Sequence, residues 1–549
     1  MIVLSGGVAA AFPGPESVAV LANADDPESL ALARKYMDAR SVPALQLCAL
    51  SLPKTDDITY ADYAAKLDGP FEACLKTAGV LDRIEAVVLM RGVPLRVGIP
   101  VNATTENVSV AAALGVWRTT LDAGGPLLGQ PSGQLGNCGG PCLAAKWVNP
   151  LLYLTGPFEA GTSIANGGAT WKPLLVTMLH GRTYADAALL IQSAVDAEKK
   201  GGAAGTFLFM DGADSARGAL DVEYPGVIKA LKTAGFSDAS EVPFKTDQAG
   251  GNLAAFFTGT ASLGTTLEGS TFAPGALVDN LTSFGAVPQN FAATGESQVS
   301  IARWVAKGVG GVHGTVDEPL NNCFPSRKLI LDYTAGAPLS EAYLRRMPFV
   351  YWRNLVLGDP LLAPYAKRPV VTLAGLAPSA SVAQLVTVTA KDLAGSGIAK
   401  IQLFVDGKLL VEGAGDTLVA CVPVHAGKTA QILAVAQNAV GAGALAKFPP
   451  KGWASVSLNG TADGIVCAPP GDGGADGGVP GGGASDPGAN GCSCRSATGG
   501  AGGPGSGAAL ALGVLVLVRR RLRNVALEDR ASAADEHDGA RGDARGARA

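Results

Sequence analysis

Apolar runs alternate with amphipathic segments from residue 17 to about residue 368, which is the pattern of an α/β protein. The run SVAVLAN precedes DDPESLALARKYMDAR, where Asp26 is placed to cap a helix that has Pro27 in its first turn. ALQLCALSLP and IEAVVLMRGVPLRV predict two further strands, the second apolar enough to be buried on both faces. Strands and helices at this spacing are joined by right-handed crossovers, so we expect a mostly parallel sheet with helices on both faces.

The same alternation returns after a long insertion. Residues 99–171 are rich in Gly, Pro and Asn and have weak periodicity, which indicates a segment that lies over the sheet. Thr183 and Asp186 then open the helix YADAALLIQSAVDAEKKGG, and GTFLFMDG predicts the strand after it. VGGVHGTVDEP predicts a later strand that ends in a loop, and Asp359 in LGDPLL is expected to cap the final turn.

Residues 369–468 have a different pattern, in which short alternating strands are separated by Gly and Asp turns. AQLVTVTAKD, IAKIQLFVDGKLL and TAQILAVAQNAVG are examples, and Asp406-Gly407 is a strong hairpin signal. We therefore expect a small β-sandwich of immunoglobulin-like type, which we interpret as a spacer in preference to a binding module.

The two ends of the chain carry little signal for a packed core. Residues 1–16 hold a short apolar run and small residues but no basic segment, so they are interpreted as a partial signal peptide, with an ordinary N-terminus as the alternative. Residues 469–491 form a Gly/Pro-rich linker that is expected to be disordered, as is the charged tail at 524–549. Residues 492–523 combine a cysteine motif, GCSC, with the apolar run AALALGVLVLV, expected to be a helix, and an arginine cluster.

This order of parts resembles the myxobacterial C-terminal sorting signal. The resemblance implies that the protein is exported and held at the cell surface or outer membrane, anchored in the membrane through this segment. It also implies that sorting machinery processes the chain, with Cys492 or Cys494 as the processing or attachment point. The polar tail beyond the arginines departs from the family and leaves the mature C-terminus open. A plain tail anchor with incidental cysteines is the alternative.

The first domain, residues 17–368, resembles a family of uncharacterised secreted bacterial proteins of similar length. The matching stretches include VVLMRGVPLRV, TYADAALLIQSAVDAEKKG, GVHGTVDEPLNNCFPS and LVLGDPLLAPY. That resemblance implies no assigned activity. More distantly, the closing pattern is similar to the end of gingipain-type cysteine peptidases, which implies a caspase-like form of the sheet.

Composition narrows the classes of partner and cofactor. Among 549 residues, 43 Lys and Arg stand against 47 Asp and Glu, and no basic patch interrupts the globular part, so nucleic acid is excluded as a partner. The chain has no P-loop, no GxSxG, no HExxH and no GxGxxG after a strand, so no organic cofactor is indicated.

The nine cysteines lack zinc-finger spacing. Cys48 with Cys74, and Cys421 with Cys467, are placed to form disulfides in an oxidising compartment, although buried thiols fit equally well. The CxxxC pair in GNCGGPC indicates a loop-closing disulfide or a reduced pair in preference to a redox site.

His313 is the main candidate for catalysis. A caspase-like peptidase needs a His at the end of one strand to activate a Cys at the end of the next. The nearest cysteine is Cys323, but it belongs to the same strand and loop as His313, and FAPGALVDNLTSFG holds Thr282 and Ser283 but no Cys. We therefore expect a non-catalytic binding or structural protein. A peptidase-like surface hydrolase that uses His313 and Cys323 is the alternative.

The loop after His313 is rich in oxygen ligands. Asp317 and Glu318, together with Asp279, predict a site for a divalent cation at the carboxyl edge of the sheet. The alternative is a well-capped loop in which Asn and Asp bond the local backbone and Pro sets the turns, and we favour the capped loop.

Overall fold

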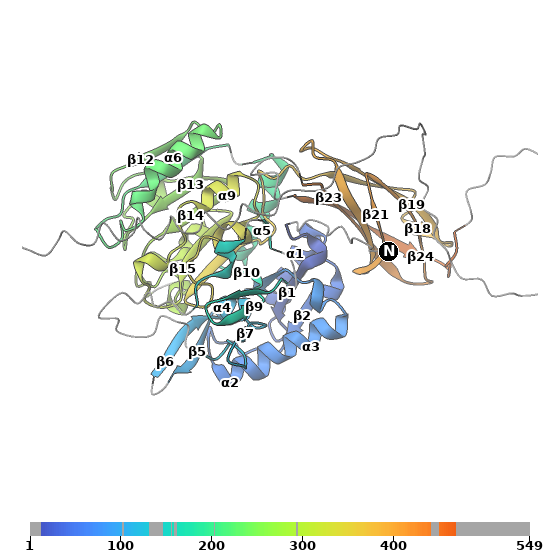
Figure 1. Cartoon of the computed structure of the whole chain (residues 1–549), viewed down its shortest axis with the longest axis horizontal. Helices are drawn as coiled ribbons and strands as arrows, with labels where there is room; N and C mark the ends of the chain where they lie inside the picture. Colours follow the sequence, from blue (N-terminus) through green and yellow to red (C-terminus); the bar gives the residue numbers. More distant parts are fainter. Residues whose placement is uncertain are drawn as a thin grey trace, which may run out of the picture. The chain divides into compact units, whose positions relative to one another are not determined.

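A ten-stranded sheet organises the first part of the chain in the computed structural model (Figure 1). The structure describes residues 12–467, apart from 102–103, 131–146, 155, 159–161, 203, 293–294 and 441–448. The strands of the sheet are β1 (Val18–Asn23), β2 (Leu47–Leu50), β4 (Ala86–Met90), β10 (Leu175–Leu179), β11 (Thr206–Met210), β12 (Ala239–Val242), β13 (Leu253–Thr258), β14 (Phe272–Asn280), β15 (Gly311–Thr315) and β16 (Asn354–Gly358). Their order across the sheet is β12, β11, β13, β14, β15, β16, β10, β4, β1, β2.

Pairing is parallel within two sets of these strands. One set is β2, β1, β4 and β10, and the other is β12, β11, β13, β14 and β15. Strand β16 lies between the sets and pairs with β15 in the antiparallel direction. The prediction of an α/β domain with a mostly parallel sheet is therefore confirmed at this level.

Apolar side chains and helices cover both faces of the sheet. Successive residues of a strand point to opposite faces, and in β13 Phe256 belongs to one hydrophobic cluster whereas Ala255 and Phe257 belong to another. Helix α6 packs beside β12 (Figure 1). The main helices are α1 (Pro27–Arg40), α3 (Gly69–Ala78), α4 (Val110–Gly115), α5 (Tyr184–Lys199), α6 (Tyr224–Thr233), α8 (Ile301–Val305), α9 (Leu329–Thr334) and α10 (Leu339–Leu344).

Two helix starts follow the sequence signals. The side chain of Asp26 accepts hydrogen bonds from backbone N–H groups in the first turn of α1, with Pro27 at the first helical position. Thr183 and Asp186 form a reciprocal capping box at the start of α5. Both capping predictions are confirmed.

The segment IEAVVLMRGVPLRV, predicted as one strand, is divided in two. Gly92 has a φ of 97° and Pro94 follows it, so β4 cannot continue. The chain then forms β5 (Arg96–Val101), which leaves the large sheet and pairs with β6 (Thr104–Ser109) and β3 (Asp57–Thr59). Strands β5 and β6 form a hairpin that extends away from the large sheet (Figure 1).

Shorter elements complete this part of the chain. The region predicted as an insertion also contains the small sheet formed by β7 (Thr120–Leu121), β9 (Ala169–Trp171) and β8 (Ile164–Asn166). Helix α2 (Tyr60–Asp62) runs through a π-helical segment (Tyr63–Asp68) into α3, and α7 (Thr266–Gly269) precedes β14.

The later strands form two further sheets over a shared apolar core. One sheet has the order β17 (Val370–Ala374), β19 (Gln384–Lys391), β22 (Thr417–Val422), and the other β18 (Ser379–Ala380), β24 (Lys451–Gly460), β23 (Thr429–Asn438), β20 (Ile398–Val405), β21 (Lys408–Ala414). Val386 and Val388 of the first sheet share a buried cluster with Ile401 and Leu403 of the second. Asp406 and Gly407, both with positive φ, form the hairpin turn between β20 and β21, as predicted.

Several sequence predictions concern residues outside those described. These are the partial signal segment before Phe12, Cys138 and Cys142, and everything after Cys467, including Cys492 and Cys494. Within the part of the chain that the structure describes, no helix is both long and apolar enough to cross a lipid bilayer.

Candidate functional site

Strands β13, β14 and β15 bring a carboxylate and a histidine together near their carboxyl ends. In the parallel register, Asp279 of β14 lies beside Phe257 of β13 and His313 of β15. Gly314 permits close packing around the histidine, because a Cβ at that position would lie 2.6 Å from the side chain of Ile301. This part of the sheet edge is where ligand sites of α/β proteins form, so its side chains decide what the domain can do.

Asp279 is the centre of a buried polar network. Its Oδ2 lies 3.0 Å from Nδ1 of His313, and its Oδ1 accepts a hydrogen bond of 2.6 Å from Nη1 of Arg327. Nε2 of His313 lies 3.0 Å from Oδ1 of Asn354. Arg327 also donates to the carbonyl of Thr258, the last residue of β13. The side chains of Asp279, His313 and Arg327 are completely buried.

Glu223 holds the segment that carries Arg327. Its carboxylate accepts hydrogen bonds from the hydroxyl of Ser326, at 2.8 Å, and from the backbone N–H of Arg327, at 2.6 Å. The guanidinium carbon of Arg327 lies 5.6 Å from the centre of the Phe257 ring. Glu223 and Phe257 therefore hold Arg327 from two sides, in addition to its ion pair with Asp279.

Asp279 and Arg327 each shift the pKa of the other toward the charged form. Burial by itself would raise the pKa of Asp279, but Arg327 and His313 hold that pKa below its ordinary value. Burial acts to lower the pKa of Arg327, yet Asp279 raises it above its ordinary value. Both groups are therefore charged, and each depends on the other to remain so inside the protein.

Both ring nitrogens of His313 are occupied by protein groups. Nδ1 faces Asp279, and Nε2 faces Asn354. The amide of Asn354 is oriented by a hydrogen bond of 3.1 Å from its Nδ2 to the carbonyl of Phe349, which leaves Oδ1 toward the histidine. The ring of Phe324 stands edge-on to the imidazole, with centroids 5.0 Å apart. Neither nitrogen is therefore directed at a substrate or a nucleophile.

Cys323 does not complete a catalytic dyad. It lies in a buried cluster with Phe349 and Trp352, and with both nitrogens of His313 engaged neither is available to deprotonate its thiol. The cavity that Asn354 lines has a volume of about 20 Å³, room for one water molecule, and neither His313 nor Cys323 lines it. The predicted pair of His313 and Cys323 is thus brought into one region but not into a catalytic arrangement.

The neighbouring ends of β13 and β14 carry an amide clasp in place of a dyad. Oδ1 of Asn280 accepts a hydrogen bond of 2.8 Å from the N–H of Thr260, and Nδ2 donates to the carbonyl of Thr260 at 3.0 Å. Residues 258–260 read TGT and residues 280–283 read NLTS, so neither strand end has a Cys or a His. The clasp joins residues 20 positions apart, so no local sequence pattern indicates it.

The residues predicted as a cation site are separated. Asp279 is bonded within the buried network, Asp317 accepts a hydrogen bond of 2.8 Å from Asn107, and Glu318 accepts one of 2.8 Å from Ser283. Oδ1 of Asp317 also accepts from the backbone N–H of Glu318 at 2.8 Å, the behaviour of a capped loop. Among the described residues, no group of three His, Cys, Asp or Glu is placed to hold a metal ion.

A second buried network surrounds Asp359. Its Oδ1 accepts a hydrogen bond of 2.9 Å from the N–H of Leu361, which is the expected cap of the final turn. The carboxylate also accepts from the hydroxyl of Tyr36, at 3.0 Å, and forms an ion pair with Arg40. Nη1 of Arg40 in turn lies 2.5 Å from Oε2 of Glu198. The cap is local and was predicted, whereas the ion pair joins residues 319 positions apart and was not.

Two disulfides join four of the described cysteines. Cys48 of β2 is disulfide-bonded to Cys74 of α3, and Cys421 of β22 is bonded to Cys467. For both pairs the sequence fitted disulfides and buried thiols equally well, and the structure has the disulfides.

Comparisons with known proteins give only distant similarity. No protein-family model matches the chain, and no curated protein matches it. A solved structure described as "Structure of Protease" is 11% identical, with a TM-score of 0.44 over 81% of this chain and 98% of that one. Fibronectin(III)-like modules of Clostridium thermocellum CbhA are 14% identical, with a TM-score of 0.14 over 20% of this chain and 53% of theirs. The Clostridium perfringens spore cortex lytic enzyme SleM is 10% identical, with a TM-score of 0.13 over 52% of this chain and 78% of its own. We assign no function from these values.

Proposed function

We propose that the chain is a non-catalytic binding or structural protein, exported and held at the cell surface through its C-terminal segment. One observation supports the proposal that the protein is not a catalyst. Both ring nitrogens of His313 are engaged inside the protein, Nδ1 with Asp279 and Nε2 with Asn354. A general base must reach the proton that it removes, directly or through one water molecule, and a completely buried imidazole with both nitrogens engaged does not.

The amide clasp supports the same proposal from a neighbouring position. In the caspase-like arrangement that the sequence resemblance implies, the dyad comes from the ends of consecutive strands. Strands β13 and β14 are neighbouring parallel strands of this sheet, and Asn280 ties their carboxyl ends together by bonding both backbone groups of Thr260. Polar groups that satisfy one another in this way stabilise the sheet edge.

The full chain is expected to hydrolyse none of a broad panel of fluorogenic peptide and ester substrates above the rate of the buffer blank. The physical reason is that His313 cannot act as a base, and the measurement is initial rate against enzyme concentration. A reference cysteine peptidase run on the same panel is the positive control. Turnover by the wild type that survives His425→Ala, in the exposed histidine of the β-sandwich, but disappears in His313→Ala would overturn the proposal.

The localisation rests on the sequence resemblance of residues 469–523 to a sorting signal. We propose that the β-sandwich is immunoglobulin-like, and that it and the linker hold the α/β domain away from the membrane.

Mass spectrometry of the mature protein, purified from its native host, is expected to find a C-terminal peptide that ends near Cys492. Cys492→Ala with Cys494→Ala should retain the tail, and alanine at the half-buried Ser283 is the processing control. An intact C-terminus at Ala549 in the wild type would refute processing.

A further inference from the structure

The β-sandwich is open at one corner. Strand β21 is the outer strand of one sheet and β22 is the outer strand of the other, and a short turn between Ala414 and Thr417 joins them at one end. At the opposite ends of these strands, near Lys408 and Pro423, the structure has a cavity with a volume of about 350 Å³. That volume lies within the range of cavities that hold ligands or inserted side chains.

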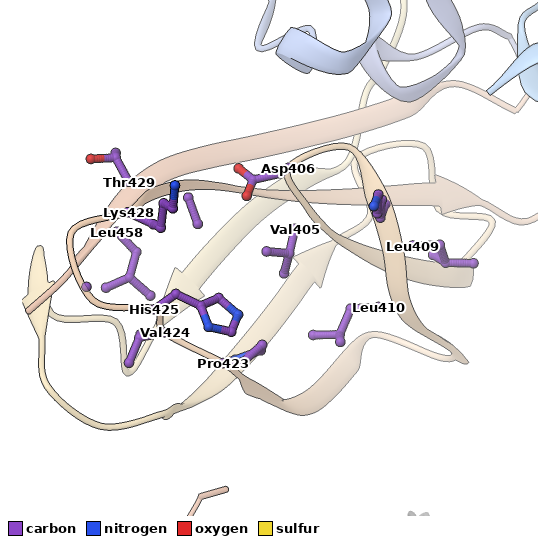
Figure 2. A pocket seen from close by; sticks show the side chains of 13 residues that line it. Val405, Asp406, Leu409, Leu410, Pro423, Val424, His425, Lys428, Thr429 and Leu458 are labelled. Atoms are coloured by element: carbon purple, nitrogen blue, oxygen red, sulfur yellow. The ribbon is translucent and has the colours of Figure 1, made fainter. Parts of the chain in front are cut away.

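Apolar residues of the five-stranded sheet and of the segment that follows β22 line this cavity. Figure 2 shows the side chains of Val405, Val424 and Leu458 gathered around one hollow, with the ring of His425 beside them. Leu410 of β21 lines the cavity from the open side. The hollow therefore continues the apolar core of the sandwich outward, toward an edge strand.

A β-bulge interrupts the edge strand where it borders the cavity. The register of β20 with β21 shifts so that Leu403 pairs with Val411 and Phe404 pairs with Leu409, which leaves Leu410 without a partner. Both Leu409 and Leu410 border the cavity, and Figure 2 shows the side chain of Leu410 on the side of Pro423 and that of Leu409 on the other side of the strand. They are 48% and 40% exposed, which is costly for adjacent leucines on an unpaired edge.

The rim of the cavity carries more positive than negative charge. Lys408 and Lys428 both line it, and Asp406 is the acidic residue among the lining groups. The carboxylate of Asp406 already accepts a hydrogen bond of 2.8 Å from the N–H of Gln431. The rim is therefore complementary to an occupant that has an apolar part and carboxylate groups.

We infer that this corner binds an extended acidic peptide by strand addition. The peptide pairs with the outer edge of β21, one large apolar side chain enters the cavity beside Leu409 and Leu410, and a neighbouring Asp or Glu meets Lys408 and Lys428. The inference rests on the binding role proposed above and gives that role a partner. It also replaces the interpretation of the sandwich as a spacer alone.

Selection of a phage library of random 12-residue peptides on the full chain tests the inference. The expected products have alternating apolar residues, with Asp or Glu next to a large apolar side chain. Leu410→Asp should weaken the selected peptides about tenfold or more, because the central apolar anchor carries most of such binding. Lys428→Glu should weaken them most at low salt. The matched controls are Leu393→Asp and Lys391→Glu, exposed residues of the same sandwich outside the cavity.

Hydrogen exchange separates strand addition from other modes of binding. The amides of Leu409–Glu412 should become protected when a selected peptide is bound. The inference fails if no peptide is enriched over a parallel selection on Leu410→Asp, or if β21 gains no protection. Peptides that bind equally well to Leu410→Asp would contradict binding at this cavity but leave the proposed binding role standing. Cleavage of the bound peptides would contradict the proposed non-catalytic function itself.

Discussion

Replacing Asp279 with alanine is expected to lower the free energy of unfolding by about 3–5 kcal/mol. The change leaves the guanidinium of Arg327 buried with no carboxylate, and it removes the partner of Nδ1 in His313. Taking one member from a buried ion pair costs far more than the pair contributes, because the remaining charge keeps its full desolvation penalty. Urea denaturation followed by tryptophan fluorescence measures the loss.

The matched control is another Asp–Arg pair of the same domain. Oδ2 of Asp332 lies 2.5 Å from Nε of Arg346, but the two side chains are 26% and 34% exposed, respectively. Asp332→Ala should therefore cost about 1 kcal/mol or less. Adding Arg327→Met to Asp279→Ala should restore part of the lost stability, because it removes the unpaired charge. A loss at Asp279 no larger than at Asp332 would show that the buried network is not a stabilising element.

The pH dependence gives a second readout of the same carboxylate. The folded-state pKa of Asp279 is below its ordinary value, whereas the unfolded-state value is about 3.9. The stability that it contributes is therefore fully present above about pH 5 and is lost as the pH falls through the unfolded and then the folded pKa. The difference in stability between the wild type and Asp279→Asn should accordingly shrink between about pH 5 and pH 3. A difference that stays constant over this range would contradict a charged Asp279.

The sequence was informative where the determining contacts are local. The caps at Asp26 and Thr183 and the turn at Asp406-Gly407 each depend on residues within a few positions, and each was predicted correctly. The order of strands and helices likewise follows from short-range periodicity. The break at Gly92 was missed because the apolar run continues through it, and hydropathy does not record a positive φ.

The buried networks were unpredictable for the opposite reason. His313 was identified as unusual because few histidines occur and glycines surround it, but its environment depends on Arg327 and Asn354, which belong to other elements. Nothing in FPSRKLI marks that arginine as buried, since arginines in such loops are ordinarily exposed. Only the tertiary fold shows that His313 is enclosed and that both of its ring nitrogens face protein groups.

Replacing Arg40 with methionine is expected to destabilise the α/β domain by about 3–5 kcal/mol. Arg40 is 3% exposed and forms ion pairs with Asp359, which is completely buried, and with Glu198. Methionine keeps much of the side-chain volume, so the loss reports the charge and not a cavity. Burial would raise the pKa of Glu198, but Arg40 and Arg368 hold it below its ordinary value. The variant is therefore left with two acidic groups that must be buried charged or take up protons.

Two further variants separate the charge of this network from its hydrogen bonds. Tyr36→Phe removes one hydrogen bond of 3.0 Å and should cost about 1 kcal/mol. Asp359→Asn keeps an oxygen to cap Leu361 but loses the ion pair, so it should cost clearly more than Tyr36→Phe. Because Arg40→Met removes the cation that Asp359 and Glu198 share and leaves Glu198 only the pair with Arg368 at 3.5 Å, the stability of the variant should improve relative to the wild type as the pH is lowered toward 5. An Arg40→Met variant whose deficit is the same at pH 5 and pH 8 would show that packing, and not charge, is what Arg40 provides.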